Sequence, residues 1–124
     1  MRWIVDGMNV IGTRPDGWWR DRQAAMATLV EKLEAWASRE AADVTVVFEK
    51  PPSPPLESTV IAVAHAPAAA PNSADDEIVR LVSAAGDPGA ITVATSDRAL
   101  ADRVRAAGAR VFSAEAMRDL VDPR

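Results

Sequence analysis

Near its start the chain reads Trp3-Ile4-Val5-Asp6-Gly7-Met8-Asn9, in which a short apolar run ends at an acid and a glycine. An apolar run of this length without strict alternation is typical of a strand that is covered on both faces. Four more short, β-branched runs follow, at 44–48, 59–63, 90–94 and 109–112. We therefore predict a sheet of five strands, of which residues 3–5 form the first.

Between most of these runs, apolar residues recur at helical spacing, over 26–37, 78–82 and 100–107. The last two helical patterns stop at Gly86 and Gly108. The Pro-rich segment 50–55 cannot be helical, so we expect an extended loop between the second and third strands. This alternation favours an α/β fold, a three-layer Rossmann-like domain with a central, mostly parallel five-stranded sheet.

The composition fits a single globular domain spanning 1–124, with 48% hydrophobic and 26% charged residues. The sequence has no cysteine and one histidine, His65, which excludes disulfides, thiolate metal sites and histidine clusters. Any metal site must therefore be rich in oxygen ligands. His65 itself is better explained as a lone polar residue at the end of a strand, because no second histidine completes a site.

The first residues reach a charge after three apolar positions, too early for a signal peptide, and no apolar run approaches a membrane span. We expect a cytoplasmic protein without membrane association. The net charge of −4 weighs against nucleic acid, because phosphate binding depends on Lys and Arg. A cluster of metal-binding carboxylates would itself supply several negative charges, however, and most of the cations are arginines, which suit bidentate phosphate contacts.

Acidic residues stand at the ends of three expected strands. Asp6 ends the first strand, Glu49 the second and Asp97 the fourth. In an open parallel sheet, ligands bind beyond the carboxyl ends of the strands, at the point where the strand order reverses. If the first strand is central, with the second on one side and the fourth on the other, these acids meet at that crevice.

A fourth acid comes from the helix that starts near Ser73. Asp75 shares a face with the apolar residues of this helix, so it points toward the sheet. A carboxylate on an inward face is costly unless a cation meets it. We expect Ser73 to cap the helix, with Asp76 completing a weak capping box or pairing with Arg80.

Two to four carboxylates without cysteine or clustered histidine suit a hard cation such as Mg²⁺ or Mn²⁺. Such an ion activates water and offsets the charge that develops in phosphoryl transfer, and one or two ions could serve. The acidic residues therefore predict a metal site that acts on phosphate.

The chain contains, in order, the motifs Asp6-Gly7-Met8-Asn9-Val10-Ile11, Ala74-Asp75-Asp76-Glu77-Ile78 and Thr95-Ser96-Asp97-Arg98. Together they resemble the NYN domains of the YacP-like group, within the PIN-like nuclease superfamily. The resemblance covers nearly the whole chain. It implies a Rossmann-like parallel sheet and a divalent-metal-dependent endoribonuclease that hydrolyses RNA, often connected with ribosomal or messenger RNA.

The resemblance also implies roles for single residues by motif matching. The catalytic acids that would hold Mg²⁺ or Mn²⁺ are Asp6, Asp75 and Asp97. Asn9 would orient a ligand or water, while Ser96 and Asp76 would support the site. Glu49 is either a fourth metal ligand or an exposed strand end.

Two departures from the family pattern keep an alternative open. The second strand ends Phe48-Glu49-Lys50 where relatives commonly have Phe-Asp, and Lys50 can compete for the carboxylate. The loop at 66–72 is neutral where relatives are often basic. The alternative is a catalytically weakened RNA- or ribosome-binding module of the same fold.

Residues outside the motifs are candidates for RNA contacts. We expect Arg14, Arg20 or Arg98 to contact phosphate, and Trp19 to stack on bases. Packing of a helix entry explains Trp19 equally well, and capping of the next helix is the simpler explanation of Asp97. The sequence indicates neither the RNA target nor the oligomeric state.

Overall fold

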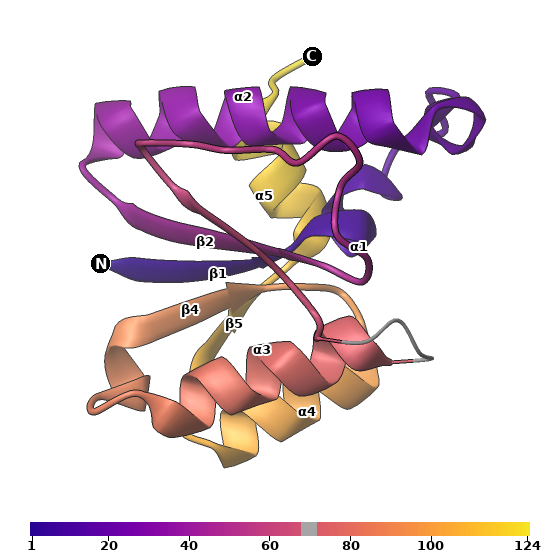
Figure 1. The fold of residues 1–124 in the computed structure, drawn as a ribbon. Helices are drawn as coiled ribbons and strands as arrows, with labels where there is room; N and C mark the ends of the chain where they lie inside the picture. Colours follow the sequence, from indigo (N-terminus) through magenta and orange to yellow (C-terminus); the bar gives the residue numbers. More distant parts are fainter. Residues whose placement is uncertain (68–71) are drawn as a thin grey trace.

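The computed structural model describes residues 1–67 and 72–124, which form a parallel sheet between two layers of helices (Figure 1). The strands are β1 (Arg2–Asp6), β2 (Asp43–Phe48), β3 (Ala62–His65), β4 (Ile91–Ala94) and β5 (Arg110–Phe112). The α-helices are α1 (Gly7–Ile11), α2 (Arg22–Glu40), α3 (Ser73–Ala84), α4 (Arg98–Ala106) and α5 (Ala114–Val121). Two 3₁₀ turns span Trp18–Arg20 and Pro88–Ala90.

All neighbouring strands run parallel, in the order β3-β2-β1-β4-β5. Val5 on the central strand lies beside Val46 of β2 and Ala94 of β4. The predicted α/β class, the five strands and the central place of the first strand are confirmed. The strand order reverses at β1, so the crevice expected at a switch point lies beyond Asp6.

Two hydrophobic cores hold the layers together. One lies under α1, α2 and α5 and contains Leu33, Phe48 and Met117. The other lies under α3 and α4 and contains Ile78 and Leu100. Each of these side chains is fully buried. The predicted three-layer arrangement follows directly, because the sheet has apolar residues on both faces.

The connection from β2 to β3 contains no helix or strand, as the proline-rich segment predicts. The third strand begins at Ala62 rather than at residue 59, so its predicted start is wrong. Ser58 explains the difference, because its Oγ accepts hydrogen bonds from the backbone N–H groups of Val60 and Ile61. These residues form a turn in place of a strand ladder.

The start of α3 also differs from the prediction. Asn72, in a left-handed conformation with φ of 61°, is the N-cap, and Ser73 is the first helical residue. Asp76 makes an ion pair of 2.9 Å with Arg103 of α4, and Arg80 pairs with Glu77 instead. The predicted capping box and the Asp76–Arg80 pair are therefore wrong. Within the loop predicted at 66–72, residues 68–71 lie outside the described residues.

Candidate active site

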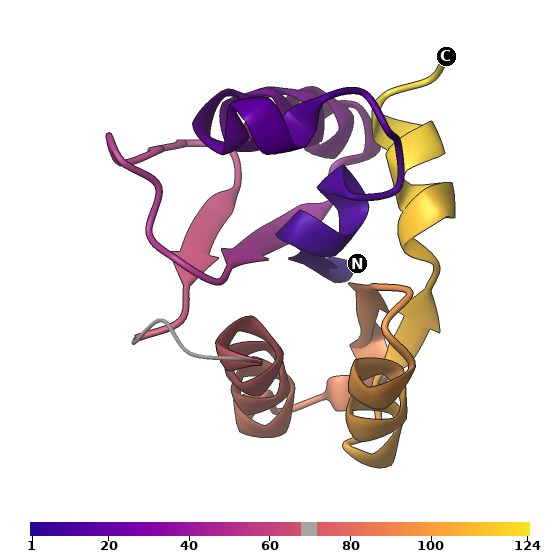
Figure 2. The ribbon, with the colours of Figure 1, turned by 90° about the vertical axis from the view of Figure 1, so that its right-hand side faces the viewer.

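A pocket of about 290 Å³ lies beyond the carboxyl ends of the central strands. Figure 2 views this edge of the sheet, where α1 and α3 begin on opposite faces. The pocket is lined by Asp6, Met8, Asn9, Val47, Glu49, Asn72, Ser73, Ala74, Asp75 and Asp97. The fold thus brings together all four acids that the sequence places at a metal site, from positions up to 91 residues apart.

Asp6 is the most buried of these acids, with 7% of its surface exposed. It stands at the N-cap position of α1, and it lines the pocket. Burial raises the pKa of Asp6 from 3.8 to about 6, and the charges of Asp75 and Asp97 add to the rise. Hydrogen bonds from the Thr95 hydroxyl and from the backbone N–H of Asn9 lower this pKa.

Asp75 lies on the first turn of α3 and is half-buried. Its pKa is raised by burial first and then by the charge of Asp97, while Arg103 lowers it and Asp76 and Glu49 raise it further. The carboxylates of the pocket therefore lie within electrostatic reach of one another. Such mutual repulsion is relieved by a bound cation.

Asp97 is the N-cap of α4, as predicted, and it also lines the acidic pocket. One carboxylate oxygen accepts a hydrogen bond of 3.0 Å from the backbone N–H of Leu100, which caps α4. The cap uses Oδ1, and Oδ2 has no hydrogen-bond partner among residues 1–67 and 72–124.

Asn9 and Ser96 form hydrogen bonds that link neighbouring elements of the fold. Asn9 Oδ1 accepts a hydrogen bond of 2.8 Å from the backbone N–H of Ser96, which ties α1 to the end of β4. The Ser96 hydroxyl donates to Glu115 at 2.6 Å and accepts from the N–H of Ala114, so it fixes the start of α5. The side-chain NH₂ of Asn9 has no partner among residues 1–67 and 72–124, and it lines the pocket as an available donor.

The residues predicted to contact RNA differ in their exposure and in their ion pairs. Arg14 is largely covered, and its guanidinium lies 3.0 Å from Asp119 and 3.5 Å from Asp122. Arg20 and Arg98 are exposed and make no ion pair within the described parts of the chain. Trp19 is 49% exposed and packs edge-on against Trp18.

Two residues that were not predicted as site residues shape the site. Thr95 is almost fully buried and hydrogen-bonds Asp6, and Arg103 stabilises the ionised form of Asp75. The sequence could have indicated Thr95 as a site residue, since it immediately precedes Ser96 and Asp97 in the third motif. The sequence could not have indicated Arg103, because the place of this residue beside α3 depends on how two helices pack.

The donor set fits a hard divalent cation, because every candidate ligand is a carboxylate and their charges repel one another. Within the described residues, no three acidic or histidine side chains are close enough to form a preformed metal-binding group. A bound cation would therefore have to draw the carboxylates of the pocket together.

A Rossmann-like sheet with acids gathered at its switch point defines a nuclease-type, RNA-related domain. The chain belongs to the YacP-like NYN domain family, whose sequence profile matches residues 3–123. This confirms the resemblance drawn from the three motifs. No curated protein sequence matches the chain.

Solved structures of Rae1 (YacP) share this fold. The crystal structure of Rae1 (YacP) from Bacillus subtilis is 27% identical, with a TM-score of 0.78 over 97% of this chain and 73% of that one. Its W164L mutant gives the same identity and TM-score over 96% and 74% of the two chains. Among the described residues, no helix is both long and apolar enough to cross a bilayer.

Proposed function

We propose that this chain is a cytoplasmic endoribonuclease that hydrolyses RNA phosphodiester bonds with Mg²⁺ or Mn²⁺ held by Asp6, Asp75 and Asp97. The observation that carries the proposal is the shared pocket, in which burial first, and then the charges of Asp75 and Asp97, raise the pKa of Asp6. Carboxylates gathered without a cation oppose one another, whereas the same group would bind a divalent ion and the phosphate beside it. Ribosomal or messenger RNA is the proposed substrate.

The residues of the pocket would have different roles. Asp6, Asp75 and Asp97 would hold the ion, with Glu49 as a further ligand at the open side of the pocket. A bound divalent ion supplies Lewis-acid stabilisation of the negative charge that grows on the scissile phosphate. The NH₂ group of Asn9 would donate to a phosphate oxygen or to water, while Ser96 and Asp76 support the elements that carry the acids.

Exposed residues outside the acidic pocket would contact the RNA strand. Arg20 and Arg98 carry unpaired charges within the described chain and would bind flanking phosphates. Trp19 would stack on a base.

One observation favours a second candidate. The described acids share a pocket without forming a preformed metal-binding group, which is what a catalytically weakened RNA- or ribosome-binding module would show. Such a module would bind RNA without cutting it, and its binding would not require a divalent ion.

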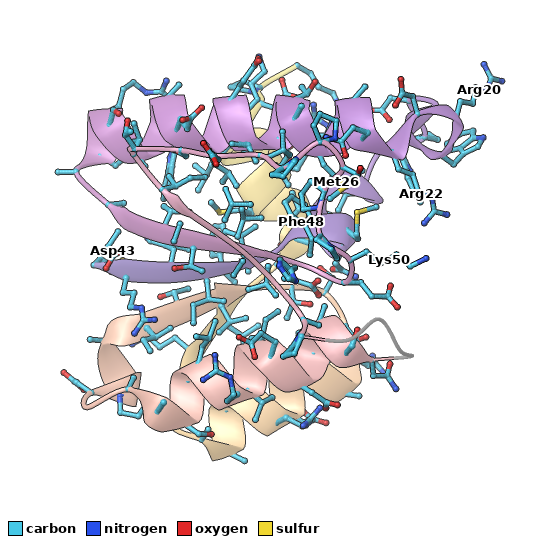
Figure 3. All side chains as sticks on the ribbon, viewed as in Figure 1. Arg20, Arg22, Met26, Asp43, Phe48 and Lys50 are labelled. Carbon is cyan, nitrogen blue, oxygen red and sulfur yellow. The ribbon has the colours of Figure 1, made fainter. Side chains whose placement is uncertain are left out.

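A cleavage assay separates the two. Purified protein is incubated with single-stranded RNA and Mg²⁺ or Mn²⁺, alongside Asp6→Asn and, as a matched control, Asp43→Asn. Asp43 is exposed at the opposite edge of the sheet, at the start of β2 (Figure 3). Cleavage that requires metal and Asp6 but not Asp43 supports the nuclease. Metal-independent binding without cleavage supports the binding module.

A further inference from the structure

A second pocket, of about 390 Å³, adjoins the acidic pocket on the α2 side of the sheet. The two pockets share Met8 and Glu49 in their walls. Its volume falls within the range of about 300–1,000 Å³ that is typical of small-molecule sites. A ligand that occupied both pockets would pass directly from one to the other.

The walls of this second pocket are mainly apolar. Met26 and Phe48 form a buried wall, Met8 lines both pockets, and the exposed Pro51 and buried Pro52 form a wall from the loop after β2. Thioethers make favourable contacts with aromatic rings and adapt to flat ligands of different outline. The pocket therefore suits a planar, aromatic group.

Hydrogen bonds hold the loop wall that contains Pro51 and Pro52 in place. The Gln23 side-chain amide accepts a hydrogen bond of 2.9 Å from the backbone N–H of Ser53 and donates one of 3.1 Å to the carbonyl of Pro54. These two bonds clamp the proline-rich loop to α2. Because the loop is already fixed, a ligand would spend little binding energy on ordering it.

Two cations stand at the rim of this second pocket. Arg22 and Lys50 are exposed, and their side chains extend beyond the carboxyl ends of β1 and β2 (Figure 3). The Arg22 guanidinium lies 5.2 Å from the ring centroid of Trp18. Neither cation makes an ion pair within residues 1–67 and 72–124, although the chain carries a net charge of −4. Unpaired cations beside an apolar pocket complement a group that is both aromatic and phosphorylated.

We propose that this second pocket binds one unstacked nucleobase of a single-stranded RNA whose neighbouring phosphate lies in the acidic pocket. The inference rests on the proposed function and narrows its substrate class. Arg22 and Lys50 bind the phosphates that flank the inserted base. A base within a duplex would first have to leave its stack, at a cost of a few kcal/mol, so single strands and loops are preferred.

The test is an abasic scan. A set of RNA oligonucleotides of one sequence, each lacking the base at a different position, is compared by kcat/KM. We expect one position beside the cleavage site where removal of the base lowers kcat/KM about tenfold, which is the scale of one stacked base. Loss of the base elsewhere should have little effect.

A blocking variant locates the effect. Ser53 is exposed at the edge of the pocket, so Ser53→Trp places an indole where the base would enter. It should lower kcat/KM for intact RNA about tenfold and remove the difference between intact and abasic RNA. Ser83→Trp, at an exposed serine of α3, is the matched control and should change neither. Lys50→Ala, which leaves the walls intact, should weaken binding and flatten its salt dependence.

The outcomes are distinguishable. If Asp6→Asn abolishes cleavage but no position is sensitive to base loss, the nucleobase pocket is wrong and the nuclease stands. The nucleobase pocket is also wrong if Ser53→Trp keeps full discrimination at the sensitive position, and a protein segment would then be the better occupant. If the parent protein cuts no RNA, or cuts it regardless of Asp6, the proposed function fails and the pocket proposal fails with it.

Discussion

The Thr95 hydroxyl donates a hydrogen bond of 2.8 Å to Oδ2 of Asp6, although 89 residues separate the two in sequence. The same hydroxyl oxygen accepts a hydrogen bond of 3.1 Å from the backbone N–H of Asp97. One buried threonine at the end of β4 therefore links the acid of β1 to the acid that opens α4. The spacing of two proposed metal ligands depends on this link.

Thr95→Val should weaken both the site and the fold. Removing the hydroxyl leaves the N–H of Asp97 without its acceptor, at a cost of about 1–3 kcal/mol in the free energy of unfolding. The pKa of Asp6 should rise further, because the Thr95 hydrogen bond lowers it. The acid limb of the kcat/KM profile should then move to higher pH. Thr95→Ser keeps the hydroxyl and should restore the parent profile. If the profile of Thr95→Ser shifted as far as that of Thr95→Val, the effect would come from packing and not from the hydrogen bond.

The raised pKa of Asp6 predicts how stability depends on pH in the metal-free protein. Between pH 3.8 and about 6 the folded state binds the proton that the unfolded chain releases. The stabilising contribution of protonated Asp6 is complete below pH 3.8 and is lost as pH rises through about 6. The loss is about 3 kcal/mol, since one pKa unit corresponds to about 1.4 kcal/mol.

Asp6→Asn should remove this pH dependence because asparagine does not ionise. We expect the variant to be more stable than the parent protein at pH 7.5 in EDTA, although it is inactive. Adding Mg²⁺ or Mn²⁺ should stabilise the parent and leave Asp6→Asn unchanged. Urea denaturation at pH 5 and 7.5, with and without metal, measures both effects. Equal metal stabilisation of the two proteins would remove Asp6 from the ligand set.

Gly7→Ala should disturb the first motif through steric overlap. A Cβ at Gly7 would lie 2.5 Å from Cε1 of Phe48, whose ring is fully buried and cannot move aside. Overpacking of this kind costs about 1–3 kcal/mol and would displace α1, which carries Asn9. Gly86→Ala is the matched control, because nothing lies within 4 Å of the added Cβ. Denaturation and cleavage rates of both variants test whether residue 7 must lack a side chain.

The sheet could be predicted from sequence because each strand is a compact apolar run. Asp6, Glu49 and Asp97 were found because they follow such runs closely, and Asp75 because it shares the apolar face of a helix. The helices α1 and α5 were missed for different reasons. Gly7–Ile11 is too short for a helical period to show, and its Asp6-Gly7 start also fits a turn. In Ala114–Val121 the inward face includes Arg118, a charged residue in the middle of the apolar pattern. Side-chain partners such as Thr95 for Asp6 depend on tertiary packing.

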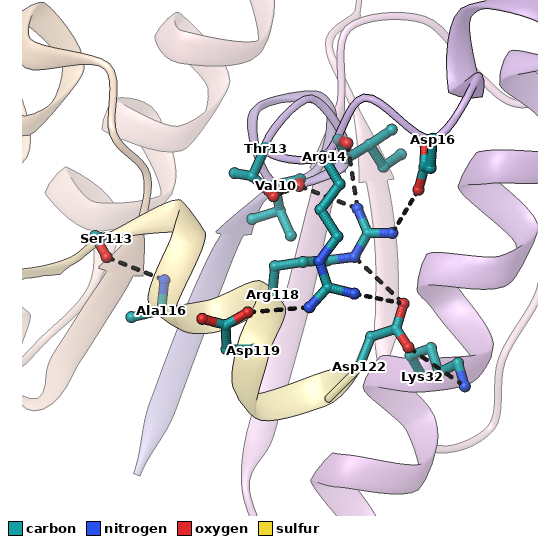
Figure 4. Close-up of polar contacts among 11 residues, drawn as sticks. Val10, Thr13, Arg14, Asp16, Lys32, Ser113, Ala116, Arg118, Asp119 and Asp122 are labelled. Carbon is teal, nitrogen blue, oxygen red and sulfur yellow. Dashed lines mark hydrogen bonds and ion pairs between the residues drawn. The ribbon is translucent and has the colours of Figure 1, made fainter. Parts of the chain in front are cut away.

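Arg118→Met should destabilise the protein by about 2–3 kcal/mol, since the buried guanidinium satisfies several acceptors at once. It donates to the carbonyls of Val10 and Ile11 at the end of α1, at 3.4 and 3.2 Å, and to Asp16 at 3.0 Å (Figure 4). Methionine keeps the apolar packing and loses these bonds. Arg105→Met, at an exposed pair of 3.9 Å with Asp102, should change stability by less than about 0.5 kcal/mol.

Salt dependence of RNA binding distinguishes cations that contact phosphate from those that hold the fold. Each phosphate contact with a single strand contributes about 0.7 to the slope of log K against log salt. Arg20→Ala and Arg98→Ala should each flatten the slope by about this amount, because both side chains are exposed and unpaired within the described chain. Arg14→Ala should leave the slope unchanged and lower stability instead, because its guanidinium is held by Asp119 and Asp122. An unaltered slope for both Arg20→Ala and Arg98→Ala would place the phosphate contacts elsewhere on the protein.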